Sequence, residues 1–157
     1  MANKVSIFFS YRGKDSEIVE PIFRALESRK AKAWLYLNHS PIRHQVSPQR
    51  LAAELTKAIG EMEVFAPFVT PNYLSTLDER GDACAFELRT ALNLGKKVLP
   101  LSYNGTQLPG IIANWGCYNL YPDDIESAAF ALIAGALRAT GKNVPQELIG
   151  YQRQHRY

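Results

Sequence analysis

The segment KVSIFFSYRGKDS, residues 4–16, contains the first structural unit of the chain and decides the fold class. Residues 4–10 form a short apolar run of β-branched and aromatic side chains, and residues 11–16 are polar. A run of this length that ends in polar residues is typical of a buried strand followed by a loop and the start of a helix. In the helix that follows, Ile18, Ile22 and Leu26 recur at helical spacing. The first unit is therefore predicted to be a strand and then a helix.

The same unit of a strand and a helix repeats along the chain. Short apolar runs predict further strands at 31–37, 63–70, 96–103 and 116–121, and helical periodicity and capping signals predict helices at 47–60, 83–94 and 122–140. Strands that alternate with helices form a parallel sheet covered on both faces. We therefore expect an α/β protein, a flavodoxin-like three-layer sandwich with a five-stranded parallel sheet over residues 1–141, followed by a polar C-terminal tail at 142–157.

Composition excludes several classes of function. The chain has 157 residues, which suits one domain, and 18 basic against 15 acidic residues leave a net charge of +3, too small an excess to predict a nucleic-acid partner. It shows no leader and no apolar run near the ~20 residues of a membrane span, so we expect a cytoplasmic protein without a membrane partner. Two cysteines without a CxxC motif predict neither a metal site nor a disulfide framework.

Ligands of parallel sheets bind beyond the carboxyl ends of the strands, and three nucleotide-binding solutions for that edge do not fit this sequence. No GxGxxG follows the first strand, and no GxxxxGK[ST] occurs. A phospho-acceptor receiver needs aspartates at the strand ends to hold magnesium, but Ser10 and Thr70 stand there. The first loop offers Arg12, whose planar guanidinium suits a bidentate hold on a carboxylate or a pyrophosphate, with a solvated loop charge as the alternative.

Glu87 is the candidate catalytic residue. On a helix over 83–94 it falls within one continuous apolar arc, formed by Ala83, Cys84, Leu88, Ala91, Leu92 and Leu94. An ionised carboxylate on the core side is costly unless a partner stabilises it or the surface is the wall of a cleft. From the residue type alone, an ion-paired structural glutamate near the start of a helix is the more common case.

Four motifs in this order resemble the Toll/interleukin-receptor (TIR) domain family. They are FFSYR at 8–12, FVTPNYLS at 68–75, CAFEL at 84–88 and KKVLPL at 96–101, and the resemblance covers roughly residues 3 to 140. The family implies one of two functions. Some members cleave NAD+ at the nicotinamide glycosidic bond with a single glutamate, whose position is filled here by Glu87, and others are scaffolds that self-associate.

Resemblance to the catalytic members, of a bacterial standalone type, implies an NAD+ nucleosidase that makes ADP-ribose or a cyclic ADP-ribose isomer, as a signalling step in antiviral defence. NAD+ is then the substrate, and no cofactor is expected. Because nicotinamide leaves as a neutral molecule, no general acid is needed, and Glu87 suffices to stabilise the cationic transition state. Phe9, Ser10, Arg12 and Ser47 would bind the substrate, with the cap of the second helix as the alternative role of Ser47.

Two departures from the family pattern favour the second function. The tryptophan that catalytic members often carry four residues before the glutamate is Ala83 here, and the second loop lacks the usual Pro-Gly pair. The alternative is therefore a non-catalytic interaction module. The partners expected are NAD+, a second copy of the chain or another TIR domain, and a separate effector protein that senses the product.

Overall fold

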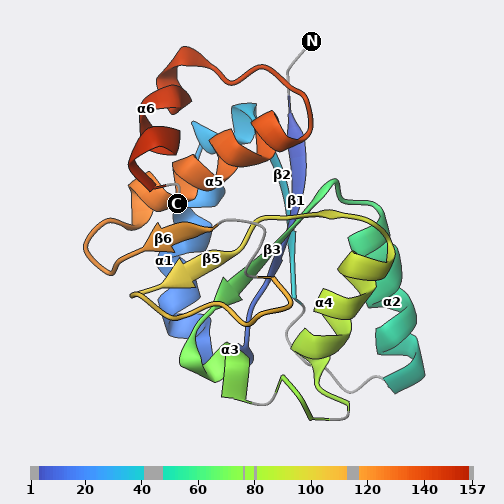
Figure 1. The fold of residues 1–157 in the computed structure, drawn as a ribbon. Coiled ribbons are helices and arrows are strands. Elements are labelled where there is room, and N and C mark those ends of the chain that lie inside the picture. Colours follow the sequence, from blue (N-terminus) through green and yellow to red (C-terminus); the bar gives the residue numbers. More distant parts are fainter. Residues whose placement is uncertain (1–3, 41–47, 76, 80, 113–116, 156–157) are drawn as a thin grey trace.

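The computed structural model describes residues 4–40, 48–75, 77–79, 81–112 and 117–155. Helices and strands alternate along them (Figure 1), in the order β1 (Val5–Ser10), η1 (Gly13–Asp15), α1 (Ser16–Leu26), η2 (Ala31–Ala33), β2 (Leu35–His39), α2 (Pro48–Gly60), β3 (Val64–Val69), α3 (Pro71–Ser75), α4 (Ala83–Asn93), β4 (Lys97–Val98), β5 (Leu101–Tyr103), β6 (Tyr118–Leu120), α5 (Ile125–Ala139) and α6 (Gln146–His155). Within this part of the chain, no helix combines the length and the apolar character that crossing a membrane requires.

The strands form one parallel sheet in the order β2-β1-β3-β5-β6, and the short β4 also pairs with β3. Helices α1 and α5 pack on one face of this sheet, and α2 and α4 pack on the other. The predicted α/β, flavodoxin-like architecture is confirmed. Because all paired strands run parallel, their carboxyl ends meet at one edge, where Tyr11, directly after β1, contacts Ser40, directly after β2.

Two predicted strands differ in detail from the observed ones. The run at 96–103 is divided into β4 and β5, because Pro100 has no N–H to donate to a ladder. The two pieces pair with successive parts of β3, so the position of the strand in the sheet is kept. The run at 31–37 begins with the 3₁₀ turn Ala31–Ala33, and its strand starts only at Leu35.

Successive side chains of β1 enter two separate apolar layers. Ile7 and Phe9 belong to the larger core cluster, with residues of α1 and α5, whereas Phe8 belongs to the smaller cluster, with residues of α2 and α4. This is the alternation of a strand that is buried on both faces. Ser10 follows in the same alternation and directs its hydroxyl to the α4 side, where it contacts Glu87.

The segment predicted as a polar tail carries the helix α6, which hydrophobic periodicity does not predict. All side chains at 128–137 of α5 are buried, so this helix needs apolar cover on more than one side. α6 supplies part of that cover: Leu148 is fully buried, and the ring of Tyr151 lies 5.5 Å from that of Phe130. α6 lies beside α5 (Figure 1), and the segment after residue 141 therefore contributes to the core.

Candidate functional site

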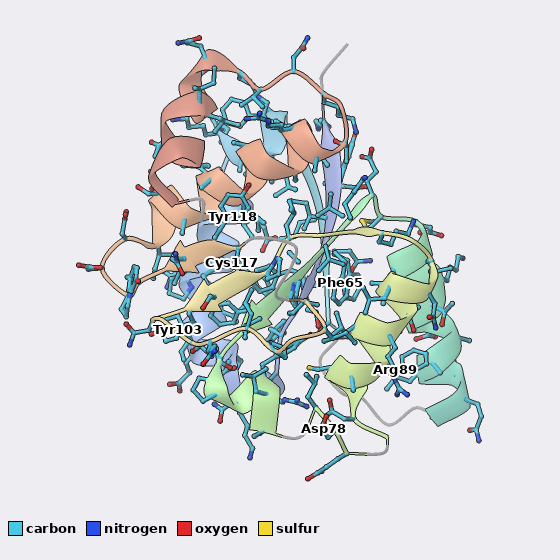
Figure 2. All side chains as sticks on the ribbon, viewed as in Figure 1. Phe65, Asp78, Arg89, Tyr103, Cys117 and Tyr118 are labelled. Atoms are coloured by element: carbon cyan, nitrogen blue, oxygen red, sulfur yellow. The ribbon has the colours of Figure 1, made fainter. Side chains whose placement is uncertain are left out.

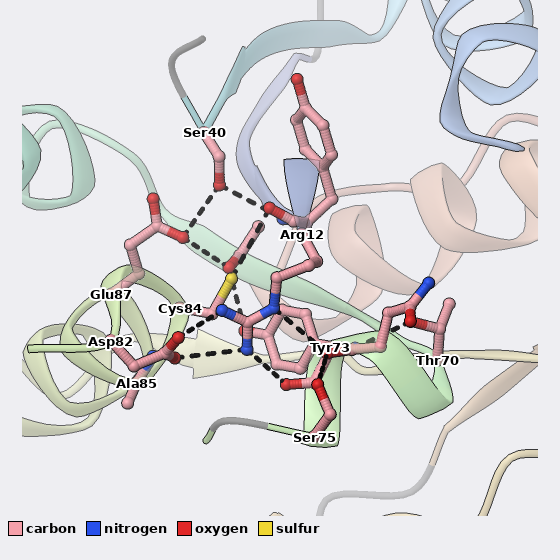
Figure 3. A network of polar contacts seen from close by, with 12 residues as sticks. Arg12, Ser40, Thr70, Tyr73, Ser75, Asp82, Cys84, Ala85 and Glu87 are labelled. Atoms are coloured by element: carbon pink, nitrogen blue, oxygen red, sulfur yellow. Dashed lines mark hydrogen bonds and ion pairs between the residues drawn. The ribbon is translucent and has the colours of Figure 1, made fainter. Parts of the chain in front are cut away.

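Glu87 lies on α4 with its carboxylate turned toward the carboxyl ends of β1 and β2. Its side chain is buried, with 1% of the residue exposed. The Oγ of Ser10, the last residue of β1, donates a hydrogen bond of 2.7 Å to Oε1 of Glu87. The Oγ of Ser40, which directly follows β2, donates a second one of 2.8 Å to the same oxygen, and Figure 3 shows this pair from close by. Two strand ends thus converge on one carboxylate oxygen.

Each serine hydroxyl has a further partner. The Oη of Tyr73, on α3, lies 2.9 Å from Ser10 Oγ, and the backbone N–H of Tyr11 donates to Ser40 Oγ over 3.2 Å. Ser40 is also held through its own backbone, since its N–H donates to the carbonyl of Phe9 over 3.0 Å. The hydroxyls are therefore positioned by the sheet and by α3.

Burial is the main influence on the charge of Glu87. It raises the pKa of this carboxyl from 4.5 to about 7, against the hydrogen bonds from Ser10 and Ser40, which act to lower it. Asp82 raises the pKa further and Arg12 lowers it. A carboxyl whose pKa is shifted to near neutrality by burial and specific partners is typical of functional sites, although structural networks also produce such shifts.

Arg12 and Asp82 fix the start of the helix that carries Glu87. Asp82 is the N-cap of α4, and its Oδ2 accepts a hydrogen bond of 2.9 Å from the N–H of Ala85. Arg12 forms a bidentate pair with the same carboxylate, with Nη1 on Oδ1 and Nη2 on Oδ2. Its Nη2 also donates to the carbonyl of Tyr73, and its Nε to the carbonyl of Asn72. One guanidinium therefore connects the first loop, α3 and α4.

A second buried carboxylate holds the same edge together but does not reach Glu87. Asp15, at the end of η1, is 1% exposed and accepts hydrogen bonds from Thr70 Oγ1 and from Asn72 Nδ2, the latter over 2.8 Å. Thr70 Oγ1 accepts in turn from the N–H of Tyr73. Because its oxygens are satisfied by neighbouring side chains, Asp15 anchors the first loop to the start of α3.

The structure brings together some of the residues that the sequence singled out and separates others. Ser10 and Glu87 are in direct contact. Arg12 lies beside them, but acceptors of the chain itself occupy its guanidinium. Phe9 is fully buried on the opposite face of β1, against the rings of Phe23 and Phe68, so the structure does not place it with Ser10. Ser47 lies outside the described residues.

Three residues of the site were missed in the sequence. Asp82 carried a readable signal, because an aspartate directly before a helical run is a typical N-cap. Ser40 comes shortly after the second predicted strand and Ser10 ends the first, and the shared edge of parallel strands would have suggested the pair. Tyr73 gave no signal, since its contact with Ser10 depends on how α3 is placed relative to the end of β1. The period-2 alternation of a strand also predicts that Phe9 and Ser10 face opposite ways.

A groove of about 560 Å³ lies on another side of α4. Its walls come from the segment before α4, from α4 and from the loop after β5, and are formed by Leu77, Asp78, Glu79, Ala85, Leu88, Arg89, Pro109 and Ile111. Figure 2 labels Asp78 and Arg89 at this position, and Glu87 is not part of the lining. Among the described residues, no three side chains of histidine, cysteine, aspartate or glutamate gather as metal ligands.

Comparison with known proteins identifies the fold family. A family model of the TIR domain matches residues 7–134, a span that runs from β1 into α5 and contains Ser10, Arg12, Ser40 and Glu87. A search of the curated proteins finds no match to the chain. Since the family model covers most of the 157 residues, and the observed parallel sheet agrees with it, the chain belongs to the TIR domain family.

Proposed function

We propose that the chain is an NAD+ nucleosidase in which Glu87 is the catalytic carboxylate. The observation that carries the proposal is the position of this group: a buried carboxylate at the carboxyl edge of a parallel sheet, held by two serine hydroxyls and with a pKa of about 7. That edge is where open α/β sheets bind their ligands. The TIR family contains NAD+-cleaving members as well as non-catalytic ones, so the assignment rests on the site.

The reaction requires a negative charge near the ribose, and it does not require a general acid. Cleavage of the bond between C1′ of the ribose and the pyridinium nitrogen gives neutral nicotinamide and an oxocarbenium-like ribosyl cation. The carboxylate of Glu87 stabilises that cation and accepts hydrogen bonds from the ribose hydroxyls, and it does so more strongly in a dry site than in water. Attack by water then gives ADP-ribose and releases a proton, whereas attack by a nitrogen or hydroxyl of the same molecule gives a cyclic isomer.

The burial of Glu87 sets a condition for this chemistry. With 1% of the residue exposed, its carboxylate reaches a ribose only after a neighbouring group has moved. The hydroxyls of Ser10 and Ser40 both donate to Oε1, so Oε2 is the oxygen that accepts a ribose hydroxyl. The two serine hydroxyls keep the buried charge hydrogen-bonded before and after the substrate binds, and this avoids the large cost of a buried, unsatisfied carboxylate.

The decisive experiment is the incubation of purified Glu87→Gln with NAD+, with nicotinamide release followed by chromatography. The change is nearly isosteric but removes the charge, so we expect cleavage to be abolished while the circular dichroism spectrum stays that of the wild type. Glu54→Gln is the control, because Glu54 lies on the exposed side of α2, where it pairs with the exposed Arg50. Wild-type turnover by Glu87→Gln would exclude Glu87 as the catalytic group.

The second candidate is a non-catalytic TIR interaction module. It is favoured by the 1% exposure of Glu87 and by Ala83 at the family's tryptophan position. Under this function the wild-type chain releases no nicotinamide at any concentration and still binds itself or another TIR domain. Chromatography of the NAD+ incubation therefore separates the two functions in one measurement.

A role in defence signalling is what the resemblance to standalone bacterial TIR proteins implies. ADP-ribose and its cyclic isomers are diffusible, so a chain that makes them acts through a separate effector protein that binds them. We place this step in bacterial antiviral defence, in the cytoplasm where NAD+ is supplied. Mass spectrometry of the product, followed by a phage infection assay with wild-type and Glu87→Gln chains, tests it; equal protection by both chains would contradict it.

A further inference from the structure

The carboxylate of Glu87 is held through one of its two oxygens. Both hydroxyls, from Ser10 and from Ser40, donate to Oε1, and within the described residues the hydrogen bonds to this side chain are these two. The serines come from different strands of the sheet and lie 77 and 47 positions away from Glu87 in the sequence. Two independent strand ends thus fix the same atom.

The direction of each hydrogen bond follows from its partners. The Oγ of Ser40 already accepts the N–H of Tyr11, so its own proton is available for Glu87. The single proton of Ser10 Oγ goes to Glu87, so the phenol of Tyr73 is the donor in the contact between Tyr73 and Ser10. An ionised carboxylate is an acceptor only, and this arrangement presents it with donors. Both hydrogen bonds are stronger when Glu87 is ionised, so the two donors favour the charged form.

We propose that Ser10 and Ser40 are positioning residues of this site, which hold Glu87 by Oε1 in its ionised form and orient Oε2 toward the substrate. The part of this proposal that concerns NAD+ rests on the proposed function of Glu87. The effect of the hydroxyls on Glu87 is a property of the folded chain, and it is measurable without NAD+.

The other groups around Glu87 do not replace the two hydroxyls. Arg12 favours the charged carboxylate, but its guanidinium is paired with Asp82, whose own charge opposes ionisation of Glu87. Tyr73 and Tyr11 are neutral, and burial together with the charge of Glu87 raises the pKa of both phenols. Removing one serine hydroxyl therefore leaves the burial of the carboxylate opposed by a single direct donor.

The first test is a titration of Glu87 in chains labelled with ¹³C at the glutamate side-chain carboxyl groups, with the resonance assigned by its loss in Glu87→Gln. We expect Ser10→Ala and Ser40→Ala each to raise the midpoint by about one to two pH units, the loss of one hydrogen bond to a charged group. Ser102→Ala is the matched control: Ser102 is 2% exposed at the same sheet edge, but its hydroxyl donates to the carbonyl of Thr106. The control should keep the wild-type midpoint.

Two milder substitutions keep the test valid even if one alanine variant fails to fold. Tyr73→Phe removes only the donor to Ser10, so its shift should be smaller than that of Ser10→Ala. Ser40→Cys keeps nearly the same volume with a much weaker donor, so it should also raise the midpoint. It takes the place of Ser40→Ala if that variant fails to fold. Midpoints equal to the wild type in the Ser10 and Ser40 variants would overturn the proposal.

The second test is the pH profile of nicotinamide release. For Ser10→Ala and Ser40→Ala we expect kcat to fall about tenfold or more near pH 6.5 and to recover at high pH, with KM for NAD+ little changed. A loss that is equal at every pH would show a merely structural role and would overturn the proposal. If the wild-type chain releases no nicotinamide, the proposed function fails, and the titration still decides whether the serines hold Glu87 ionised.

Discussion

The guanidinium of Arg12 is paired with the carboxylate of Asp82, the residue that caps the helix carrying Glu87. The two side chains are only 11% and 5% exposed, so this is a largely buried ion pair. Arg12 lies in the loop after β1 and Asp82 lies 70 positions later, directly before α4. The pair therefore sets the position of α4, and of Glu87, relative to the end of β1.

We predict that Arg12→Ala destabilises the fold by about 3–5 kcal/mol, because it leaves the buried carboxylate of Asp82 without its cation. Asp82→Asn should cost less than Asp82→Ala, by about 1 kcal/mol, because asparagine is also a good N-cap. Urea unfolding followed by circular dichroism measures these costs.

The control for this pair is Arg24→Ala. Arg24 pairs with Glu20 on the exposed side of α1, where both side chains are about 70% exposed, and such pairs contribute about 0.3–0.5 kcal/mol. If Arg12→Ala costs no more than Arg24→Ala, the buried pair does not hold α4. The sequence-based prediction that Arg12 binds the substrate is tested separately, by measuring KM for NAD+ in an Arg12 variant that remains folded.

Stability should depend on pH through Glu87. Its pKa is about 7 in the folded chain against 4.5 unfolded, so the native state holds the proton more tightly than the unfolded state does. The corresponding stabilisation is complete below pH 4.5 and is lost as the pH rises through 7. The difference between these two pKa values corresponds to roughly 3 kcal/mol, and glutamine does not titrate.

We therefore expect the stability of Glu87→Gln, relative to the wild type, to increase from pH 4.5 to pH 8 by up to about 3 kcal/mol. Urea midpoints of both chains at a series of pH values give this difference, and the titrations of all other groups cancel in it. Glu54→Gln should show a constant difference. A constant difference for Glu87→Gln would mean that Glu87 titrates normally in the folded chain.

Activity should depend on association between chains. In one chain Glu87 is 1% exposed and Ala83 stands at the family's tryptophan position, so we expect a second TIR domain to complete or open the site. Specific activity in the nicotinamide assay should then rise over roughly a hundredfold range of protein concentration, by mass action. Flat specific activity across a range in which sedimentation shows the chain passing from monomer to oligomer would contradict this.

The helix α6 should be part of the folding unit. Leu148 is fully buried, and truncation of a buried leucine to alanine costs about 2–5 kcal/mol. We expect a cost in this range for Leu148→Ala, and a lower Tm for a chain that ends at residue 141. Glu147→Ala, at an exposed position of the same helix, should change stability by no more than about 0.5 kcal/mol. A neutral Leu148→Ala would support a domain that ends at 141.

Much of the fold could be predicted from local patterns. The apolar run of β1 and the periodicity of α4 each depend on neighbouring residues, and both elements form near the predicted positions. The predicted apolar arc of α4 extends one residue too far: Leu94 is 47% exposed, because the helix ends at Asn93 and the chain turns away. The helix α6 was missed because its few apolar residues show no clear pattern by themselves. They are buried because they pack against α5, whose residues 128–137 are all buried.

By itself, the sequence determined the alternation of strands and helices and the core-side position of Glu87, since spacing along one element decides which face is buried. Only the tertiary structure decided which side chains contact the carboxylate of Glu87. Its contacts with Ser10 and Ser40, and the capture of Arg12 by Asp82, join residues 77, 47 and 70 positions apart. Such contacts depend on the order and register of the strands at the shared sheet edge, and no local pattern of side chains encodes that order.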